Sequence, residues 1–552
     1  MRLSCVAMLI WVSWGLLADD QSTPPKNPHT DSRIQEAAAL LGLSLTETER
    51  SMMLPDLFQQ MGQLQALRQL TYDNSLSPAL YFNPFPNGKP PTIEDLSPVF
   101  ETATLVRPLD EEELAFLPVT HLSSLLHSGQ VTSLELTKLY LKRLELYGPK
   151  LACVISLLKE SALARAAQMD AELKAGHDRG PLHGIPYGIK DLFAVEGTKT
   201  TWGAEPYKDQ TINTTATVVQ RLNDAGAVLL TKLSLGALAM GDVWYGGTTK
   251  NPWDLAQGSS GSSAGSSAAT AAALVPFSLG TETLGSIVSP STRCGVTGLR
   301  PSFGRVSRSG AMALSWSMDK VGPICRNVED CALVFNVIRG EDHNDFSVMD
   351  APFPYNYGQS ISKVRVGYLE AGFNPKNPNA GLEQSALVVL RDLGIELIPI
   401  TLPKMPVEAM TLILMAEASA AFESLTLENR DDLLKKQDKN SWPNGFRASH
   451  FIPAVAYIQA NRARTELIRA MAAEMAKVDV FISPSFAPNL LQVTNLTGHP
   501  CVVLPNGLDK DGHPTSISFI GKLFGEAEML ALASAYQKKT GFHQQRPKAY
   551  KE

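Results

Sequence analysis

Hydrophobic residues recur along the chain with two different spacings, and segments of the two kinds alternate. Residues 217–225 carry apolar positions at helical spacing, Gly226 follows them, and residues 227–230 form a short apolar run. Residues 364–400 show a strand, a helix, a glycine and a second strand in that order. Glycine often follows a helix because it adopts the left-handed backbone conformation without steric cost. Helices that alternate with buried strands predict an α/β domain.

The same patterns predict further elements. Thr132 and Glu135 have the spacing of a capping box, which predicts the start of a helix, and Gly148-Pro149 predicts its end. Additional helices are predicted at residues 162–175, 268–274 and 526–540, and additional strands at residues 186–189, 479–484, 501–505 and 516–520.

The N-terminal part of the chain has a different character. Residues 32–71 have helical periodicity, and Thr46 and Glu49 form another capping box. Residues 75–108 are rich in proline and lack periodicity, which indicates a strap along the surface. We therefore expect a helical cap and strap at residues 32–115 and one large domain at residues 116–548.

The first residues have the pattern of a secretory signal peptide. Arg2 gives a positive start, residues 3–17 are apolar but short for a bilayer span, and Ala18 is small, as a cleavage site requires. Residues 1–18 therefore predict a secreted or periplasmic protein, with an uncleaved membrane anchor as the alternative. Residues 19–31 are polar and contain prolines, so we expect a disordered leader.

Composition narrows the class of protein. Of the 552 residues, 44% are hydrophobic and 19% charged, as in ordinary globular proteins. The net charge of -6, without a long run of Lys or Arg, argues against nucleic acid as a main partner. The ten histidines form no HExxH or CxxC-type cluster, so we expect no metal.

The cysteines lack the density of a disulfide scaffold. We expect those beyond the signal segment to be buried small residues, and the alternative for two of them is a Cys325–Cys331 disulfide. They are Cys153, Cys294, Cys325, Cys331 and Cys501.

The stretch from Ser259 to Ser291 differs from these elements. It contains a Gly/Ser loop, the Ala-rich run at residues 268–274, and a second loop that ends Thr283-Leu284-Gly285-Ser286. Glycine lets a backbone approach a ligand closely, and serine hydroxyls are candidate nucleophiles. Flexible linkers do not usually contain an apolar helix, so this stretch indicates an active site.

Two motifs resemble the amidase signature family. One consists of Gly261-Ser262-Ser263, then Gly285-Ser286-Ile287, then residues 294–301 (CGVTGLRP). The other lies upstream at residues 184–191 (GIPYGIKD) and is similar to the family's lysine motif. The similarity covers residues 117–547, most of the chain. It implies an α/β fold in which helices cover both faces of a large mixed β-sheet.

The resemblance also implies catalytic roles. Ser286 would be the nucleophile, Ser262 the bridging serine held by a cis peptide bond, and Lys190 the base. The oxyanion hole would consist of the backbone N–H groups of Thr283, Leu284, Gly285 and Ser286.

A lysine acts as a base only when its amine is neutral. Its pKa in water is about 10.4, and burial or a nearby positive charge must lower that value. Lys190 follows the apolar residues Ile185, Pro186 and Ile189, which favours burial. The hydroxyl of Ser262 can donate and accept at once, as is needed to pass a proton to Lys190.

The sequence departs from the family pattern around the nucleophile. The family usually has two glycines where this chain has Leu284-Gly285, and often an arginine where it has Val288. Glu282 is retained, and Arg293 is a candidate ion-pair partner for it. The bulk of Leu284 predicts an altered substrate shape or a lower activity.

Two segments are candidates for the wall of a substrate pocket. Met240, Trp244 and Tyr245 precede the Gly/Ser loop, although each is explained equally well as a core residue. Residues 405–472 have a mostly helical pattern, and the resemblance implies that this variable region helps to line the substrate channel.

Residues 261–265 match GxSxG, which indicates a second candidate function. That motif would make Ser263 the nucleophile of an α/β-hydrolase esterase, with Asp479 and either His499 or His543. It arises easily in a Gly/Ser-rich stretch, and it leaves the lysine motif unexplained.

A third function is a secreted binding protein on an amidase scaffold, in which Leu284 and Val288 reflect lost chemistry. An amidotransferase component that makes ammonia from glutamine is disfavoured, because that work is cytosolic and residues 1–18 predict export. We expect instead a hydrolase that cleaves C–N bonds of small linear amides, with carbamates or esters as further substrates, through an acyl-enzyme on Ser286. It would need no cofactor and would be a monomer or homodimer.

Overall fold

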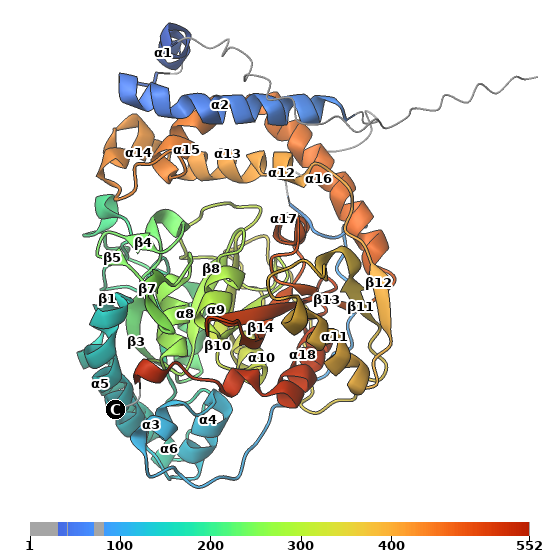
Figure 1. Ribbon diagram of the computed structural model, residues 1–552. Coiled ribbons are helices and arrows are strands. Elements are labelled where there is room, and N and C mark those ends of the chain that lie inside the picture. The colour runs from blue at the N-terminus through green and yellow to red at the C-terminus, as the bar shows by residue number, and fades with distance from the viewer. Residues whose placement is uncertain (1–30, 41, 71–81, 551–552) are drawn as a thin grey trace, which may run out of the picture.

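The computed structural model describes residues 31–40, 42–70 and 82–550. Within them, eleven strands form one mixed β-sheet, and helices cover both of its faces (Figure 1). The expected α/β fold is therefore confirmed. The predicted signal peptide and nearly all of the predicted leader lie outside the described residues, so secretion stays a prediction. No helix in the described ranges combines the length and apolar character that a bilayer span requires.

The sheet combines parallel and antiparallel neighbours. β2 pairs in parallel with β3 and β8, β11 pairs in parallel with β12 and β13, and the other neighbours are antiparallel. The strands, in spatial order, are β1 (Val154–Leu157), β3 (Val228–Leu233), β2 (Pro186–Lys190), β8 (Ser278–Glu282), β10 (Lys320–Cys325), β9 (Thr297–Arg300), β14 (Cys501–Leu508), β15 (Pro514–Gly521), β13 (Val480–Pro484), β11 (Val366–Leu369) and β12 (Leu397–Ile400).

The sequence patterns found seven of these strands and missed β1 and the three central strands β8, β9 and β10. The segment that forms β8 was expected to be a loop, which is wrong. Each central strand contains a glycine where a neighbouring segment leaves no room for a side chain. A Cβ at Gly280 would lie 2.7 Å from Ser263 Oγ, one at Gly298 2.5 Å from Ser291 Oγ, and one at Gly322 1.8 Å from Leu299 O. Close packing therefore removed the apolar signal that identifies strands.

Two predicted helix boundaries are wrong. The helix that opens with the Thr132 capping box does not end at Gly148-Pro149 but includes Pro149, and Ala152, with φ 47°, ends it. The Ala-rich helix begins four residues early, at Ala264, and its residues are all buried. The helices of this part are α3 (Glu111–Ala115), α4 (Val119–His127), α5 (Ser133–Leu151), α6 (Lys159–Lys174), α7 (Thr217–Asp224), α8 (Ala264–Ala271), α9 (Val288–Cys294), α10 (Val328–Ile338), α11 (Ala380–Asp392), α17 (Leu490–Leu496) and α18 (Glu526–Thr540). Short strands form two hairpins outside the sheet: β4 (Val243–Trp244), β5 (Gly247–Thr248), β6 (Lys250–Asn251) and β7 (Asp254–Gly258).

A layer of helices lies across one end of the molecule, at the top of Figure 1. Residues 405–472 supply most of it, and the N-terminal helices pack on its outer side. The buried guanidinium of Arg447 joins the two parts through an ion pair of 2.8 Å with Glu49, the capping-box residue. The layer consists of α1 (Asp31–Leu40), α2 (Glu47–Arg68), α12 (Val407–Met410), α13 (Leu412–Ala421), α14 (Glu423–Leu427), α15 (Trp442–Ser449) and α16 (Ala454–Met475).

The five cysteines beyond the signal segment are buried and free. Their burial is as expected, and the structure has no Cys325–Cys331 disulfide.

Candidate active site

Lys190 ends β2, and its side chain is fully buried. Strands β3 and β8 flank β2, so the interior of the sheet surrounds the amine. Its Nζ lies within hydrogen-bonding distance of three hydroxyls: 2.8 Å from Ser262 Oγ, 2.9 Å from Thr281 Oγ1 and 3.2 Å from Ser263 Oγ. Hydroxyls bind either protonation state of an amine, because they donate as well as accept.

The surroundings of Lys190 favour the neutral amine. Burial lowers the pKa of Lys190 to about 7, although Asp319 and Glu282 act in the opposite direction. A buried ammonium loses its hydration, and the three hydroxyls carry no negative charge to replace it. Much of the amine is therefore neutral near pH 7, as a base requires.

The loop that contains Ser262 lies directly beside the loop that contains Ser286. The peptide bond between Gly261 and Ser262 is cis. A Cβ on Gly261 would lie 1.8 Å from Gly241 O, so this position accepts only glycine. The N–H of Ser263 donates to Ser286 O over 3.1 Å, and α8 begins at the next residue. The fold thus brings Lys190, Ser262 and the backbone of Ser286 together.

The segment from Thr283 to Ser286 connects β8 to α9. Gly285 has φ +87°, which a glycine adopts without strain, whereas Leu284 is not among the residues with positive φ. Within the described residues, none of the four backbone N–H groups of positions 283–286 donates to another protein group. These groups are therefore available to an oxyanion, and Leu284 fits the loop conformation. Ser286 is 8% exposed.

Glu282 binds the backbone immediately after this loop and thereby fixes the position of the loop. Its Oε2 accepts from the N–H groups of Ile287 and Val288 at 2.9 and 3.0 Å. Its Oε1 lies 2.5 Å from Arg300 Nη1. This ion pair is fully buried and holds the pKa of Glu282 at about 2 despite desolvation.

The expected pairing of Arg293 with Glu282 is wrong. Arg293 lies on α9 and donates to Gln257 Oε1 over 3.0 Å. The partner is Arg300 because it lies on β9, and β10 alone separates β9 from the strand of Glu282.

Asp319 is a further carboxylate at the site that the sequence patterns did not identify. It accepts from Thr283 Oγ1 over 2.5 Å and from the N–H groups of Leu314 and Ser315. Burial raises its pKa, and these hydrogen bonds act in the opposite direction. Asp319 therefore ties the start of the β8–α9 loop to residues 314–315.

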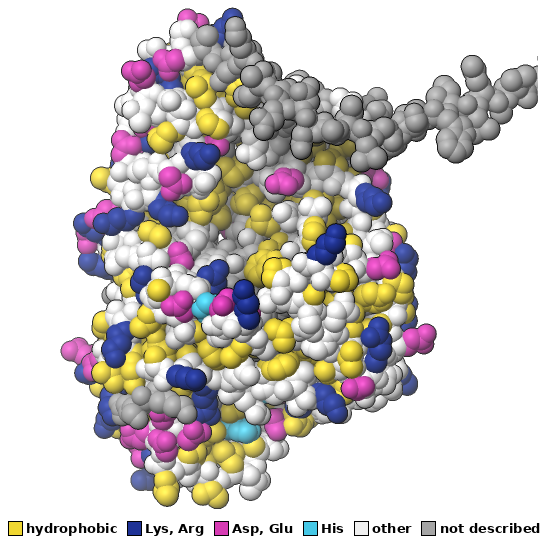
Figure 2. All heavy atoms as spheres, viewed as in Figure 1, with side chains coloured by type: hydrophobic (Ala, Val, Ile, Leu, Met, Phe, Trp, Pro, Cys, Tyr) yellow, Lys and Arg dark blue, Asp and Glu magenta, His cyan; other side chains and the backbone are white. Residues whose placement is uncertain are grey.

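A cavity of about 730 Å³ is lined by Thr281, Thr283 and Asp319, whereas Lys190, Ser262 and Ser286 are not among its lining residues. Thr281, whose hydroxyl contacts Lys190, and Thr283 mark one end, here called the catalytic end after the proposed site beside it. The helices α13 and α16 contribute Ala416, Glu417, Ala420 and Tyr457. The cavity therefore lies between the end of β8 and the helical layer. A hollow between the same two parts is visible in Figure 2, and hydrophobic side chains gather in it.

The three residues expected in the pocket wall lie elsewhere. Trp244 is buried, and its Nε1 donates to Ala152 O over 3.1 Å. The Tyr245 ring packs edge-on against Trp244, with centroids 4.9 Å apart, and Met240 is exposed. None of the three lines the cavity, although Ala239 does. Residues 308–317 and 344–347 line it instead, and no sequence pattern singled them out.

The structure does not assemble the esterase triad at Ser263. The hydroxyl of Ser263 donates to Thr281 O and accepts from Thr281 N, so it braces α8 against β8. Asp479 binds Arg365 and Lys522, and His499 binds Thr497. His543 lies near the C-terminus after α18. Among the described residues, no group of three or more His, Cys, Asp or Glu side chains is placed to hold a metal ion.

Known sequences and structures are similar to most of this chain. Residues 135–494 match the family described as Amidase. The chain is 34% identical to a glutamyl-tRNA(Gln) amidotransferase subunit of Halorhodospira halophila over 482 residues, or 78% of this chain and 99% of that protein. The peptide amidase of Stenotrophomonas maltophilia superimposes with a TM-score of 0.68 and 28% identity, over 77% of this chain and 97% of that one. An amidase family protein from Bacillus anthracis gives a TM-score of 0.71 at 25% identity, over 79% of this chain and 93% of that one.

Proposed function

The chain belongs to the amidase family of enzymes, which act on C–N bonds, and we propose that it hydrolyses small linear amides through Ser286, Ser262 and Lys190. The observation that carries this proposal is the position of Lys190. A fully buried amine with a pKa of about 7 lies 2.8 Å from Ser262 Oγ, in the loop that contacts Ser286.

This arrangement supports the following proton path. Neutral Lys190 accepts a proton from Ser262, which takes one from Ser286 as the Ser286 oxygen attacks the amide carbonyl. The C–N bond then breaks, and the proton returns by the same path to the leaving nitrogen. Water, activated by the same groups, hydrolyses the acyl-enzyme and releases the carboxylic acid.

The loop before Ser286 supplies the second requirement. The backbone N–H groups of positions 283–286 stabilise the negative oxygen of the tetrahedral intermediate. The ion pair of Glu282 with Arg300 fixes this loop, because Glu282 binds the N–H groups that follow Ser286. Preorganised donors of this kind need no rearrangement during the reaction.

Trapping of the acyl-enzyme tests the proposal. The protein is incubated with a panel of primary amides, ammonia release is measured, and acid-quenched samples are mapped by mass spectrometry. We expect an acyl group on Ser286 and no ammonia release by Ser286→Ala. Ser289→Ala is the matched control, because Ser289 lies three residues away and its hydroxyl binds Ser260. Undiminished ammonia release by Ser286→Ala would refute the assignment, and a folded protein that cleaves no amide would favour the binding-protein function.

A further inference from the structure

The charged side chains that line the cavity all have partners within the described protein. Arg308 pairs with Asp345, and Glu417 accepts from the hydroxyls of Ser315, Ser317 and Tyr457. Asp319 accepts from Thr283 Oγ1 over 2.5 Å, as described above. The amine of Lys320 donates to Met318 O, and burial beside Arg300 lowers its pKa well below the usual range. Each of these charged side chains therefore already has an ion-pair or hydrogen-bond partner in the protein, which favours an uncharged substrate group.

The exposure of the lining residues rises from the catalytic end of the cavity to its mouth. Thr281 and Thr283 are buried, whereas Trp316 is 52% and Phe346 84% exposed. Between them the wall is mostly apolar, with Leu192, Phe303, Met312, Leu314 and Val321. Large exposed aromatic side chains at the rim of an apolar cavity are typical of ligand-binding sites.

Trp316 lies on a backbone that is fixed on both sides. Its carbonyl oxygen accepts from Arg308 Nη1 over 2.5 Å. The N–H of the next residue, Ser317, donates to Glu417 of α13 over 3.0 Å. The indole of Trp316 therefore extends from a backbone segment that these two hydrogen bonds fix.

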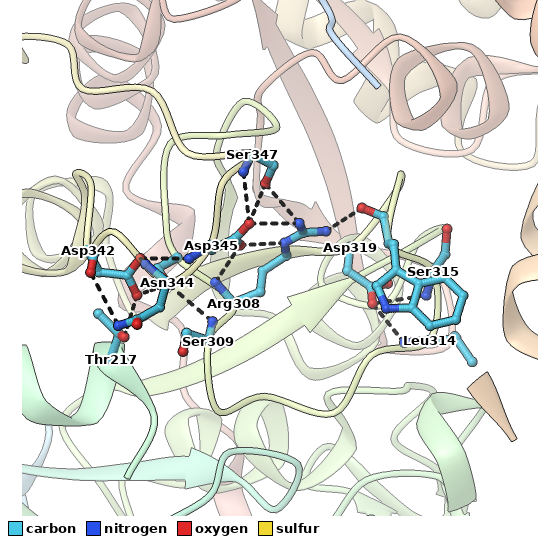
Figure 3. Close-up of polar contacts among 12 residues, drawn as sticks. Thr217, Arg308, Ser309, Leu314, Ser315, Asp319, Asp342, Asn344, Asp345 and Ser347 are labelled. Atoms are coloured by element: carbon cyan, nitrogen blue, oxygen red, sulfur yellow. Dashed lines mark hydrogen bonds and ion pairs between the residues drawn. The ribbon is translucent and has the colours of Figure 1, made fainter. Parts of the chain in front are cut away.

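Phe346 lies between Asp345 and Ser347 in a loop that two carboxylates hold. Figure 3 shows these carboxylates, Asp342 and Asp345, with their contacts. Asp342 accepts from the N–H groups of Asn344 and Asp345 and from Thr217 Oγ1 over 2.5 Å. Asp345 accepts from Ser347 and from three groups of Arg308: its backbone N–H, Nε and Nη2, at 2.9, 2.8 and 3.0 Å.

Arg308 therefore joins the two loops. One edge of its guanidinium binds Asp345 beside Phe346, while Nη1 binds the carbonyl of Trp316. Its Cζ also lies 5.0 Å from the centre of the Phe303 ring in the cavity wall. A bidentate arginine fixes direction as well as distance, so the backbone that carries both aromatic residues is held before a substrate arrives.

We propose that Trp316 and Phe346 form a specificity subsite for an aromatic or bulky apolar group of the amide substrate, at the mouth of the cavity. The proposal rests on the function proposed above and specifies its substrate class. The scissile carbonyl reaches Ser286 at the catalytic end while the apolar group packs on the two rings. A cavity of about 730 Å³ would be left mostly unfilled by a simple aliphatic amide. Arg308 also lines the cavity, and we assign it the role of a positioning residue that holds the two loops.

A pair of substrates tests the subsite directly. kcat/KM is measured for 3-phenylpropanamide and for propanamide, which shares its reacting group but lacks the ring. We expect Trp316→Ala with Phe346→Ala to lower kcat/KM for 3-phenylpropanamide about tenfold, the value of one well-packed aromatic contact. The value for propanamide should stay the same. Val388→Ala is the control, because Val388 is 52% exposed on α11 and does not line the cavity.

The outcomes separate the subsite from the reaction. Equal losses for both amides, or no loss for either, would overturn the subsite while the amidase function stands. A wild-type protein that prefers propanamide would overturn it as well. A wild-type protein that cleaves no amide would remove the proposed function itself, and the subsite with it.

The positioning role of Arg308 has its own readout. Arg308→Met should raise KM for 3-phenylpropanamide several-fold while kcat stays the same, because the reacting groups are untouched. Arg308→Lys keeps the charge but lacks the forked guanidinium that joins Asp345 to Trp316. Its KM for 3-phenylpropanamide should therefore lie between the values of the wild type and Arg308→Met. A fall in kcat for both amides would show that Arg308 supports only the fold.

Discussion

The two ends of the cavity are built in opposite ways. At the catalytic end, Lys190 and Ser262 are buried, and their contacts come from strands and from a loop that only glycine permits at Gly261. At the mouth, Trp316 and Phe346 are exposed, on loops that an ion pair holds together. From this difference we predict that bond cleavage and substrate selection can change independently. Substitutions at the first end should lower kcat, and substitutions at the second should raise KM.

The largest effect expected at the catalytic end comes from Lys190→Met. It removes the proposed base but keeps an apolar side chain of similar length, so the protein should fold. We expect kcat to fall on the order of 10⁴-fold, comparable to the loss of a residue that orients a general base. Steady-state kinetics with both test amides measures this. A loss of less than tenfold would show that Lys190 is not the base.

The buried ion pair beneath the nucleophile loop should dominate stability at this end. Arg300→Met leaves the Glu282 carboxylate buried without its partner. The free energy of unfolding should fall by about 3 to 5 kcal/mol, as measured by urea denaturation. The exposed pair of Lys199 with Asp209 provides the control, and Lys199→Met should cost no more than about 1 kcal/mol. Equal costs for the two variants would contradict the role of burial.

The pH dependence of the reaction should report only the catalytic end. In the proposed mechanism the neutral amine of Lys190 is the active form, and burial lowers the pKa of Lys190 to about 7. kcat/KM should therefore rise about tenfold per unit below pH 7 and level off above it. The combined substitution of Trp316 and Phe346 by alanine should lower the plateau for 3-phenylpropanamide without moving the midpoint. A midpoint that shifts when Trp316 and Phe346 are replaced would mean that the two ends of the cavity are coupled.

The smallest effect is expected at Leu284, which belongs to the proposed oxyanion hole and whose bulk is expected to affect substrate shape. Its backbone does not require glycine, and its side chain packs partly against the core. Leu284→Gly should change kcat only a few-fold, while KM for bulky amides falls because the loop presents less bulk. Kinetics with the two amides tests this. A rise in kcat beyond about tenfold would show instead that the leucine impairs the reaction.

The sequence predicted the elements whose signal is local. Capping boxes at Thr46 and Thr132 marked helix starts, and apolar runs marked seven strands. β8 lacked this signal because the active-site loop packs too closely against Gly280 for a side chain. The partner of Glu282 could not be read from proximity in sequence, since the order of strands decides it.

The residues at the mouth of the cavity could not be predicted from the sequence either. Residues 308–317 and 342–347 have no periodic pattern, and their contact depends on Arg308 and Asp345, which are 37 positions apart. Residue type and position before the Gly/Ser loop favour Met240, Trp244 and Tyr245 as pocket residues. The β4–β5 hairpin directs Trp244 towards Ala152 instead.

Covalent labelling with a fluorophosphonate probe tests the central claim most directly. We predict a single label, mapped by mass spectrometry to Ser286, absent in Ser286→Ala and greatly slowed in Lys190→Met. The alanine substitutions at Trp316 and Phe346 should leave the rate of labelling by a small probe unchanged. A label on Ser263, or equal labelling rates in the wild type and Lys190→Met, would contradict the Ser286–Ser262–Lys190 mechanism.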